Sequence, residues 1–112
     1  MANKVNKTTP QGYELPVVSG MTPGTSELYK NQFGEVNINA SVQKSGEVLT
    51  SGEVIAVLPE GFRPKTELAP PCTLFPPFGA GHISIYPDGR IAVLTDSTTA
   101  RSVFFSTRFL AQ

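Results

Sequence analysis

Proline and glycine interrupt this chain throughout, and their spacing limits what it can fold into. The 112 residues include ten prolines and ten glycines, and the stretches between them show no convincing apolar periodicity of a helix. The stretches are short, many are rich in β-branched residues, and they recur about every 8–12 residues, which is typical of sandwiches and barrels. We therefore predict an all-β fold, an antiparallel β-sandwich or barrel of jelly-roll-like type. The pattern does not separate the sandwich from the barrel.

Two segments in the first half carry the clearest strand signals. Residues 35–43 alternate polar and apolar side chains without a break, as expected for a strand with one face in water. Residues 27–33, just before them, are the expected partner strand. Residues 53–58 form a continuous apolar run that stops at Pro59, which favours a short buried strand over a helix.

The second half contains the clearest hairpin. Residues 82–86 and 90–94 flank Pro87-Asp88-Gly89, in which Pro and Asp favour a type I turn and Gly supplies a positive φ. A last strand is expected at 102–106. Its adjacent residues Phe104 and Phe105 must point to opposite faces of the sheet. One of the two therefore needs a second apolar environment, such as another subunit.

Residues 67–75 are a further expected strand, but Pro70 and Pro71 interrupt it. Proline cannot donate a hydrogen bond to a ladder, so we expect this strand at a sheet edge or in a crossover. Residues 1–24 are polar and broken by proline and glycine, and we expect a leader or connector arm there. Residues 25–112 then form the single β domain.

Charge and cysteine content exclude several classes of function. Nine basic residues balance nine acidic ones, so the chain lacks the basic surface that nucleic acids or anionic membranes attract. No apolar run reaches the ~18 residues of a membrane span. The single cysteine, Cys72, excludes an intrachain disulfide and a multi-cysteine metal site. We expect no metal, no cofactor, no nucleic-acid partner and no membrane insertion.

Catalytic residues are sparse. Cys72 and His82 are the only cysteine and histidine, and the residues around Cys72 carry no nucleophile signature, so a packed thiol is the expected state. The acidic residues are scattered, and Asp88 already has a structural role in the hairpin turn. We therefore expect no enzyme, with glycoside hydrolysis as a minor alternative that needs an acidic pair.

The order of motifs resembles that of small C-terminal β modules in tail-fibre, baseplate and minor structural proteins of bacteriophages and prophages. The resemblance covers about residues 25–110, and its most specific part is Leu58-Pro59-Glu60-Gly61-Phe62-Arg63-Pro64. The other matching stretches are Tyr29 to Val36, Gly52 to Val57 and His82 to Ile91.

This resemblance implies a homotrimeric head domain in the virion, made in the cytoplasm of the host bacterium and attached to other tail or baseplate proteins. It implies adsorption to cell-surface polysaccharide or teichoic acid. A purely structural virion module that caps or trimerises a fibre is the alternative. The family has no fixed catalytic or sugar-binding residues to transfer, and the shared Tyr29, Gly34, Pro59, Gly61, Arg63 and Pro64 look structural.

Candidate ligand-binding residues follow instead from polarity, expected exposure and position near a hairpin tip. They are His82, Tyr86, Asp88, Arg90 and Arg101. A tyrosine ring offers an apolar face with a polar tip, which suits a sugar. Arg90 and Arg101 are candidates to hold phosphate of a teichoic-type polymer.

Overall fold

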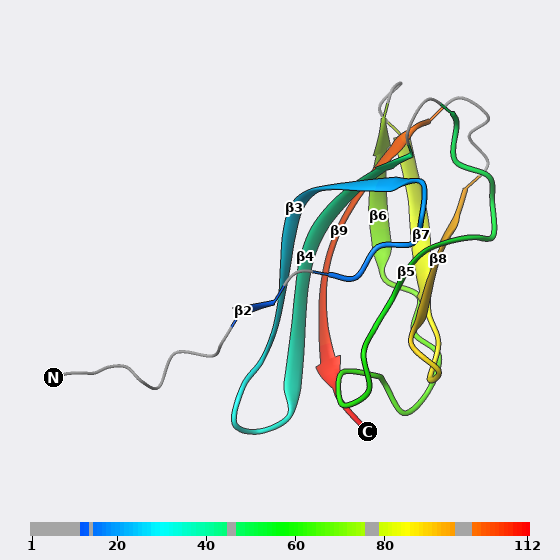
Figure 1. Ribbon diagram of the computed structural model, residues 1–112. Helices are drawn as coiled ribbons and strands as arrows, with labels where there is room; N and C mark the ends of the chain where they lie inside the picture. Colours follow the sequence, from blue (N-terminus) through cyan, green and yellow to red (C-terminus); the bar gives the residue numbers. More distant parts are fainter. Residues whose placement is uncertain (1–11, 14, 45–46, 76–78, 96–99) are drawn as a thin grey trace, which may run out of the picture.

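The computed structural model describes residues 12–13, 15–44, 47–75, 79–95 and 100–112, and in this part every regular element is a β-strand. Eight strands form one sheet in the order β2-β3-β4-β9-β6-β7-β8-β5, with antiparallel neighbours (Figure 1). The all-β antiparallel prediction is confirmed. The strands are β2 (Gly12–Tyr13), β3 (Met21–Lys30), β4 (Glu35–Lys44), β5 (Glu53–Val57), β6 (Pro71–Phe75), β7 (Gly79–Ile85), β8 (Arg90–Leu94) and β9 (Ser102–Leu110). Within these ranges, no helix is long and apolar enough to cross a membrane.

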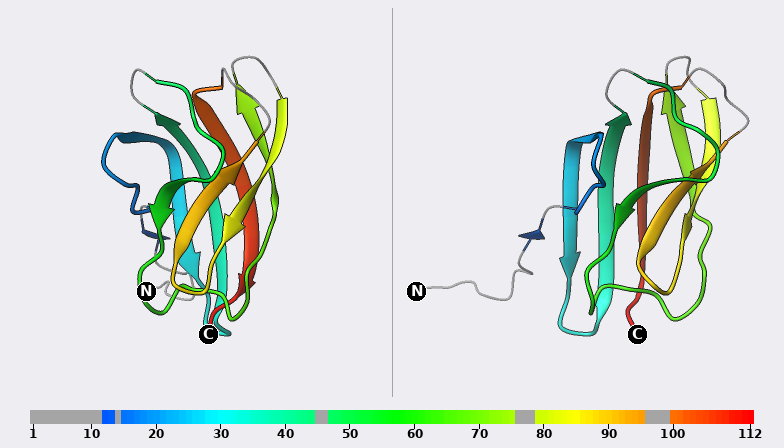
Figure 2. Two further views of the ribbon diagram at one scale, coloured as in Figure 1. Left: turned by 90° about the vertical axis from the view of Figure 1, so that its right-hand side faces the viewer. Right: turned by 45° about the vertical axis from the view of Figure 1, so that its right-hand side comes forward.

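The sheet rolls into a nearly closed barrel, because the chain just before β3 lies along β5 (Figure 2). The amide of Val18 donates to the carbonyl oxygen of Ile55 at 3.1 Å, and the amide of Val57 donates to that of Pro16 at 3.0 Å. These bonds occupy the edge of β5 that β8 leaves free. Segment 16–18 therefore protects an edge that unpaired would invite association with other chains.

The period-2 pattern of residues 35–43 places alternate side chains of β4 on opposite faces of the sheet. Val36, Ile38, Ala40 and Val42 point into the barrel and are buried, while the residues between them lie on the outer face. β3 and β9 pair with β4 on its two sides. The strand predicted at 35–43 is confirmed, and its partner extends from Met21 to Lys30, so that Phe33 lies in the connecting turn.

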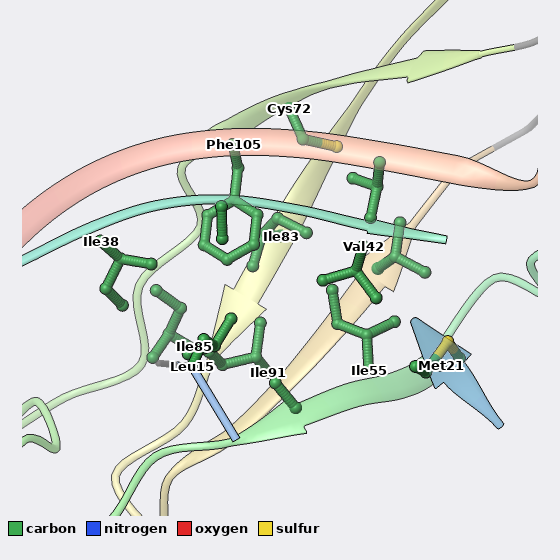
Figure 3. Packing of buried hydrophobic residues seen from close by; sticks show 14 of the residues in the cluster. Leu15, Met21, Ile38, Val42, Ile55, Cys72, Ile83, Ile85, Ile91 and Phe105 are labelled. Carbon is green, nitrogen blue, oxygen red and sulfur yellow. The ribbon is translucent and has the colours of Figure 1, made fainter. Parts of the chain in front are cut away.

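The core fills the inside of the rolled sheet (Figure 3). Phe105 of β9 packs there with residues of β7 and β8 such as Ile83, Ile85 and Ile91, all essentially inaccessible to water. Leu15 and Met21 also belong to this core. Burial of each apolar side chain of this size contributes about 1.5–3 kcal/mol to the free energy of folding. The boundary predicted at 24/25 lies within β3. Residues 1–11 and 14 of the predicted leader lie outside the described residues, so the division into an arm and a domain stays a prediction.

Strand β6 corrects the expectation of a proline-disrupted edge strand at 67–75. It lies between β9 and β7 in the interior of the sheet. Pro71 is tolerated because it is the first residue of the strand, paired with His82 of β7, while pairing with β9 begins only at Thr73. Residues 58–70 connect β5 to β6, and β6 itself is a regular interior strand, so neither of the two predicted arrangements describes it.

The hairpin of β7 and β8 is confirmed. Tyr86 and Arg90 close it through an amide-to-carbonyl bond of 2.9 Å, and the amide of Gly89 donates to Tyr86 at 2.8 Å. Gly89 has a φ of 98°, the positive φ that the sequence predicted for this glycine.

Candidate functional site

Three of the five predicted site residues lie together at the tip of the β7–β8 hairpin. Nε of Arg90 donates to Oδ2 of Asp88 at 2.8 Å, and its guanidinium carbon lies 4.6 Å from the centre of the Tyr86 ring. The backbone amide of Arg90 also donates to Asp88 and, with its side chain, lowers the pKa of Asp88. A phosphate at Arg90 would therefore compete with a carboxylate already in place.

His82 is separate from this cluster. It is on β7, four residues before Tyr86, which follows the end of this strand. The two residues are therefore about 13 Å apart along the strand direction. His82 pairs with Leu94 of β8. Its exposed side chain lines an open hollow of about 500 Å³ together with Ser51, Ala80, Gly81, Leu94 and Thr95.

Strand β9 begins at the end of the barrel opposite the β7–β8 turn (Figure 1), and Arg101 immediately precedes its first residue. Its backbone is held by Phe75 and Lys44: the Arg101 amide donates to the Phe75 carbonyl at 3.2 Å, and the Lys44 amide donates to the Arg101 carbonyl at 2.9 Å. The predicted set is thus spread over three places, and only Tyr86, Asp88 and Arg90 share a surface. Ligand binding by any of the five stays a prediction.

Cys72 and His82 do not form a nucleophilic pair. Cys72 points into the core from β6, whereas His82 is exposed on β7. Burial raises the pKa of the Cys72 thiol to about 11, so the thiol is protonated at neutral pH. In the described ranges, no group of three or more His, Cys, Asp or Glu side chains is placed to hold a metal ion.

A polar hollow of about 420 Å³, which was not predicted from the sequence, lies on the outer face of β3, β4 and β9. We call it the outer polar groove. Cross-strand pairing places Tyr29, Asn37 and Arg108 in one row and Glu27, Asn39 and Ser106 in the next. Nδ2 of Asn39 donates to Oε1 of Glu27 at 2.9 Å. The outward polar positions of β4 and its pairing with the preceding strand were predicted from the sequence, but the position of β9 on the other side of β4 was not.

An apolar surface lies farther along the same outer face. Phe75 of β6 and Phe104 of β9 are 38% and 37% exposed, and they are diagonal neighbours, because Phe104 pairs with Thr73 and Phe75 with Ser102. We call these two residues the Phe75/Phe104 patch. Phe105 points the other way into the core, so the predicted opposition of Phe104 and Phe105 is confirmed.

Comparison with known proteins gives a structural match only. No family model matches the chain, and no curated protein matches it. The fold is similar to that of the head domain of phage bIL170, whose crystal structure was described in a study of receptor-binding domains of lactococcal phages. The TM-score is 0.68 at 16% sequence identity, and the match covers 93% of this chain and 100% of that one.

Proposed function

We propose that this chain is a receptor-binding module of a bacteriophage tail fibre or baseplate, which attaches the virion to a bacterial surface polysaccharide or teichoic acid. The observation that carries the proposal is the similarity of nearly the whole fold to a phage head domain from a study of receptor binding. The motif order Leu58 to Pro64 points to the same class of protein. In this proposal the chain is made in the host cytoplasm and joins other tail or baseplate proteins in the virion.

The proposed assembly is a homotrimer. The Phe75/Phe104 patch supports it, because two half-exposed phenylalanines side by side on a sheet are typical of a surface that another subunit covers. The zero net charge gives little repulsion between copies. Three copies about one axis would present three weak sites at once, so that avidity replaces affinity.

Two alternatives make different predictions. A structural module that caps or trimerises a fibre would also use the Phe75/Phe104 patch, but it would bind no cell surface. A glycan hydrolase, the minor alternative, would release reducing sugar from cell walls and lose this activity when one acidic residue is changed.

The test is adhesion of the fluorescently labelled full chain to whole cells of a panel of bacterial strains, measured by flow cytometry. Adhesion to some strains, inhibited by wall polysaccharide or teichoic acid purified from the same strain, is the expected result. A trimer that adheres to no strain would overturn the proposal in favour of the structural module. Sugar release from the walls would instead favour the hydrolase.

A further inference from the structure

We propose that the outer polar groove is a binding site for neutral pyranose sugars, the repeating units of an uncharged polysaccharide. The inference deepens the proposed function, on which it rests for the biological source of the sugar. Binding of a simple sugar in the groove can be measured whatever the natural receptor is.

The groove is built on a rigid support. β4 lies at its centre and is paired with β3 along one side and with β9 along the other. Strand pairing places neighbouring side chains within each row ~4.8 Å apart, and the two rows lie two residues, about 6.7 Å, apart along the strands. The volume of about 420 Å³ is within the range of small-ligand sites. The site therefore needs little ordering on binding, which favours affinity.

Three polar side chains of the groove are available to a ligand. Among the described residues, no side-chain hydrogen bond or ion pair engages Tyr29, Asn37 or Arg108. Tyr29 and Asn37 are half-buried and Arg108 is exposed. A half-buried hydroxyl and amide have lost part of their water and gain from a partner that replaces it. These three residues form a single row across β3, β4 and β9.

The mixture of groups fits a sugar better than other ligands. Tyr29, for which the resemblance favours a structural role, lines the groove, where it offers an aromatic face for the C–H side of a sugar ring and a hydroxyl at its tip. Asn37 both donates and accepts, Arg108 only donates, and the carboxylate of Glu27 accepts. Neighbouring hydroxyls of a pyranose act as donors and acceptors together, so they can use all of these groups.

Charge selects a neutral ligand over an anionic one. The groove holds one cationic side chain, Arg108, and one anionic side chain, Glu27, so their charges cancel. A phosphate or uronate attracted by Arg108 would be repelled by Glu27 within the same groove. An uncharged sugar meets no such opposition, and this is why we assign an uncharged polysaccharide and not a teichoic acid.

The test is a titration of the ¹⁵N-labelled full chain followed by NMR, with glucose, galactose, rhamnose, N-acetylglucosamine and, as an anion, glycerol 3-phosphate. We expect at least one neutral sugar to shift the amide signals of residues 27–29, 37–39 and 106–108. Tyr29→Ala and Arg108→Ala should each weaken that binding by about tenfold, while Tyr29→Phe tests the hydroxyl with the ring retained. Lys65→Ala removes an exposed cation elsewhere and should leave the affinity unchanged.

The inference is overturned if no neutral sugar shifts these amides, if the shifts map to the hairpin tip or the His82 hollow, or if glycerol 3-phosphate binds the groove more tightly than every sugar. Cell adhesion separates this result from the proposed function. Sugar binding in the groove by a chain that adheres to no strain supports the site and overturns the function. Adhesion that survives Tyr29→Ala and Arg108→Ala, with no sugar-induced shifts, supports the function and overturns the site.

Discussion

A backbone hydrogen bond between Leu58 and Gly89 connects the start of the segment 58–70 to the tip of the β7–β8 hairpin. The amide of Leu58 donates to the carbonyl oxygen of Gly89 at 2.7 Å, and the Leu58 carbonyl accepts from Nε of Arg63 at 3.0 Å. A Cβ atom on Gly89 would lie 2.6 Å from the Leu58 oxygen and 2.7 Å from Nε of Arg63. The glycine is thus required twice, for its positive φ of 98° and for this close approach. Arg63 bonds within its own chain here, as expected for a structural residue.

Gly89→Ala should destabilise the domain by about 2–5 kcal/mol, because it adds backbone strain to a clash with Leu58 and Arg63. Gly61→Ala is the matched control, since Gly61 has a φ of 94° and nothing within 4 Å of its added Cβ. Gly61→Ala should lower the free energy of unfolding by roughly 1–2 kcal/mol, from backbone strain alone. Urea unfolding of both variants measures the difference. Equal losses would show that the contact with the segment 58–70 is unimportant.

Leu15→Ala should lower the free energy of unfolding by about 2–5 kcal/mol, because Leu15 is 2% exposed and leaves a cavity in the core. Leu110→Ala makes the same chemical change at a side chain that is 62% exposed and should cost less than about 0.5 kcal/mol. Urea unfolding curves give both values. If the two variants are equally stable, the segment before β3 contributes nothing to the domain.

Acid should weaken the link between β4 and β5. Burial alone would raise the pKa of Glu53, but bonds from Nζ of Lys44 at 2.8 Å and from the Thr50 amide at 3.0 Å outweigh burial and lower it. A carboxylate with a lowered pKa in the folded state stabilises the fold above its unfolded pKa of about 4.3. This stabilisation is lost as the pH falls through the folded pKa.

The Glu53→Gln variant should therefore lose less stability than the wild type between pH 7 and pH 3, and it should be the less stable of the two at pH 7. The measurement is the urea midpoint at each pH. Glu67→Gln is the control, because Glu67 is exposed and the described residues offer it no hydrogen bond or ion pair. A pH dependence of Glu53→Gln that matches the wild type would contradict the prediction.

Local patterns in the sequence were enough to predict the strands that depend on local chemistry. The alternation of 35–43 and the turn Pro87-Asp88-Gly89 each specify their own structure, whatever the rest of the chain does. The start of β3 was missed because Pro23 and Gly24 look like breaks, whereas the structure has a register shift there between Pro23 and Ser26. The interior place of β6 was missed because strand order depends on long-range pairing.

The residues of the candidate sites divide in the same way, into those that a local turn brings together and those that long-range strand pairing brings together. Tyr86, Asp88 and Arg90 come together because one hairpin carries all three, so their proximity follows from the turn. The outer polar groove joins Tyr29 of β3 to Arg108 of β9 through Asn37 of β4. Tyr29 and Arg108 are far apart in the chain, and a register change of one residue would turn either strand's polar face inward. The predicted pairing of 27–33 with 35–43 brings Tyr29 and Asn37 onto neighbouring strands, but no pattern in the sequence places Arg108 beside them.

The Phe75/Phe104 patch should control the assembly of the chain. We expect light scattering after size-exclusion chromatography to give a mass near three subunits for the wild type. Phe104→Ser combined with Phe75→Ser should give a monomer, because the replaced rings no longer bury apolar area between subunits. Both rings are on the outer face, so the fold itself should survive, which circular dichroism checks.

Phe33→Ser is the control for this last prediction, because Phe33 is 77% exposed in the β3–β4 turn, away from the patch. It removes the same ring and should leave the mass of the assembly unchanged. A wild-type chain that is a monomer would overturn the trimer outright. A trimer that persists in the Phe75/Phe104 double variant would place the contact between subunits on another face, and the half-exposed phenylalanines would then need a different partner.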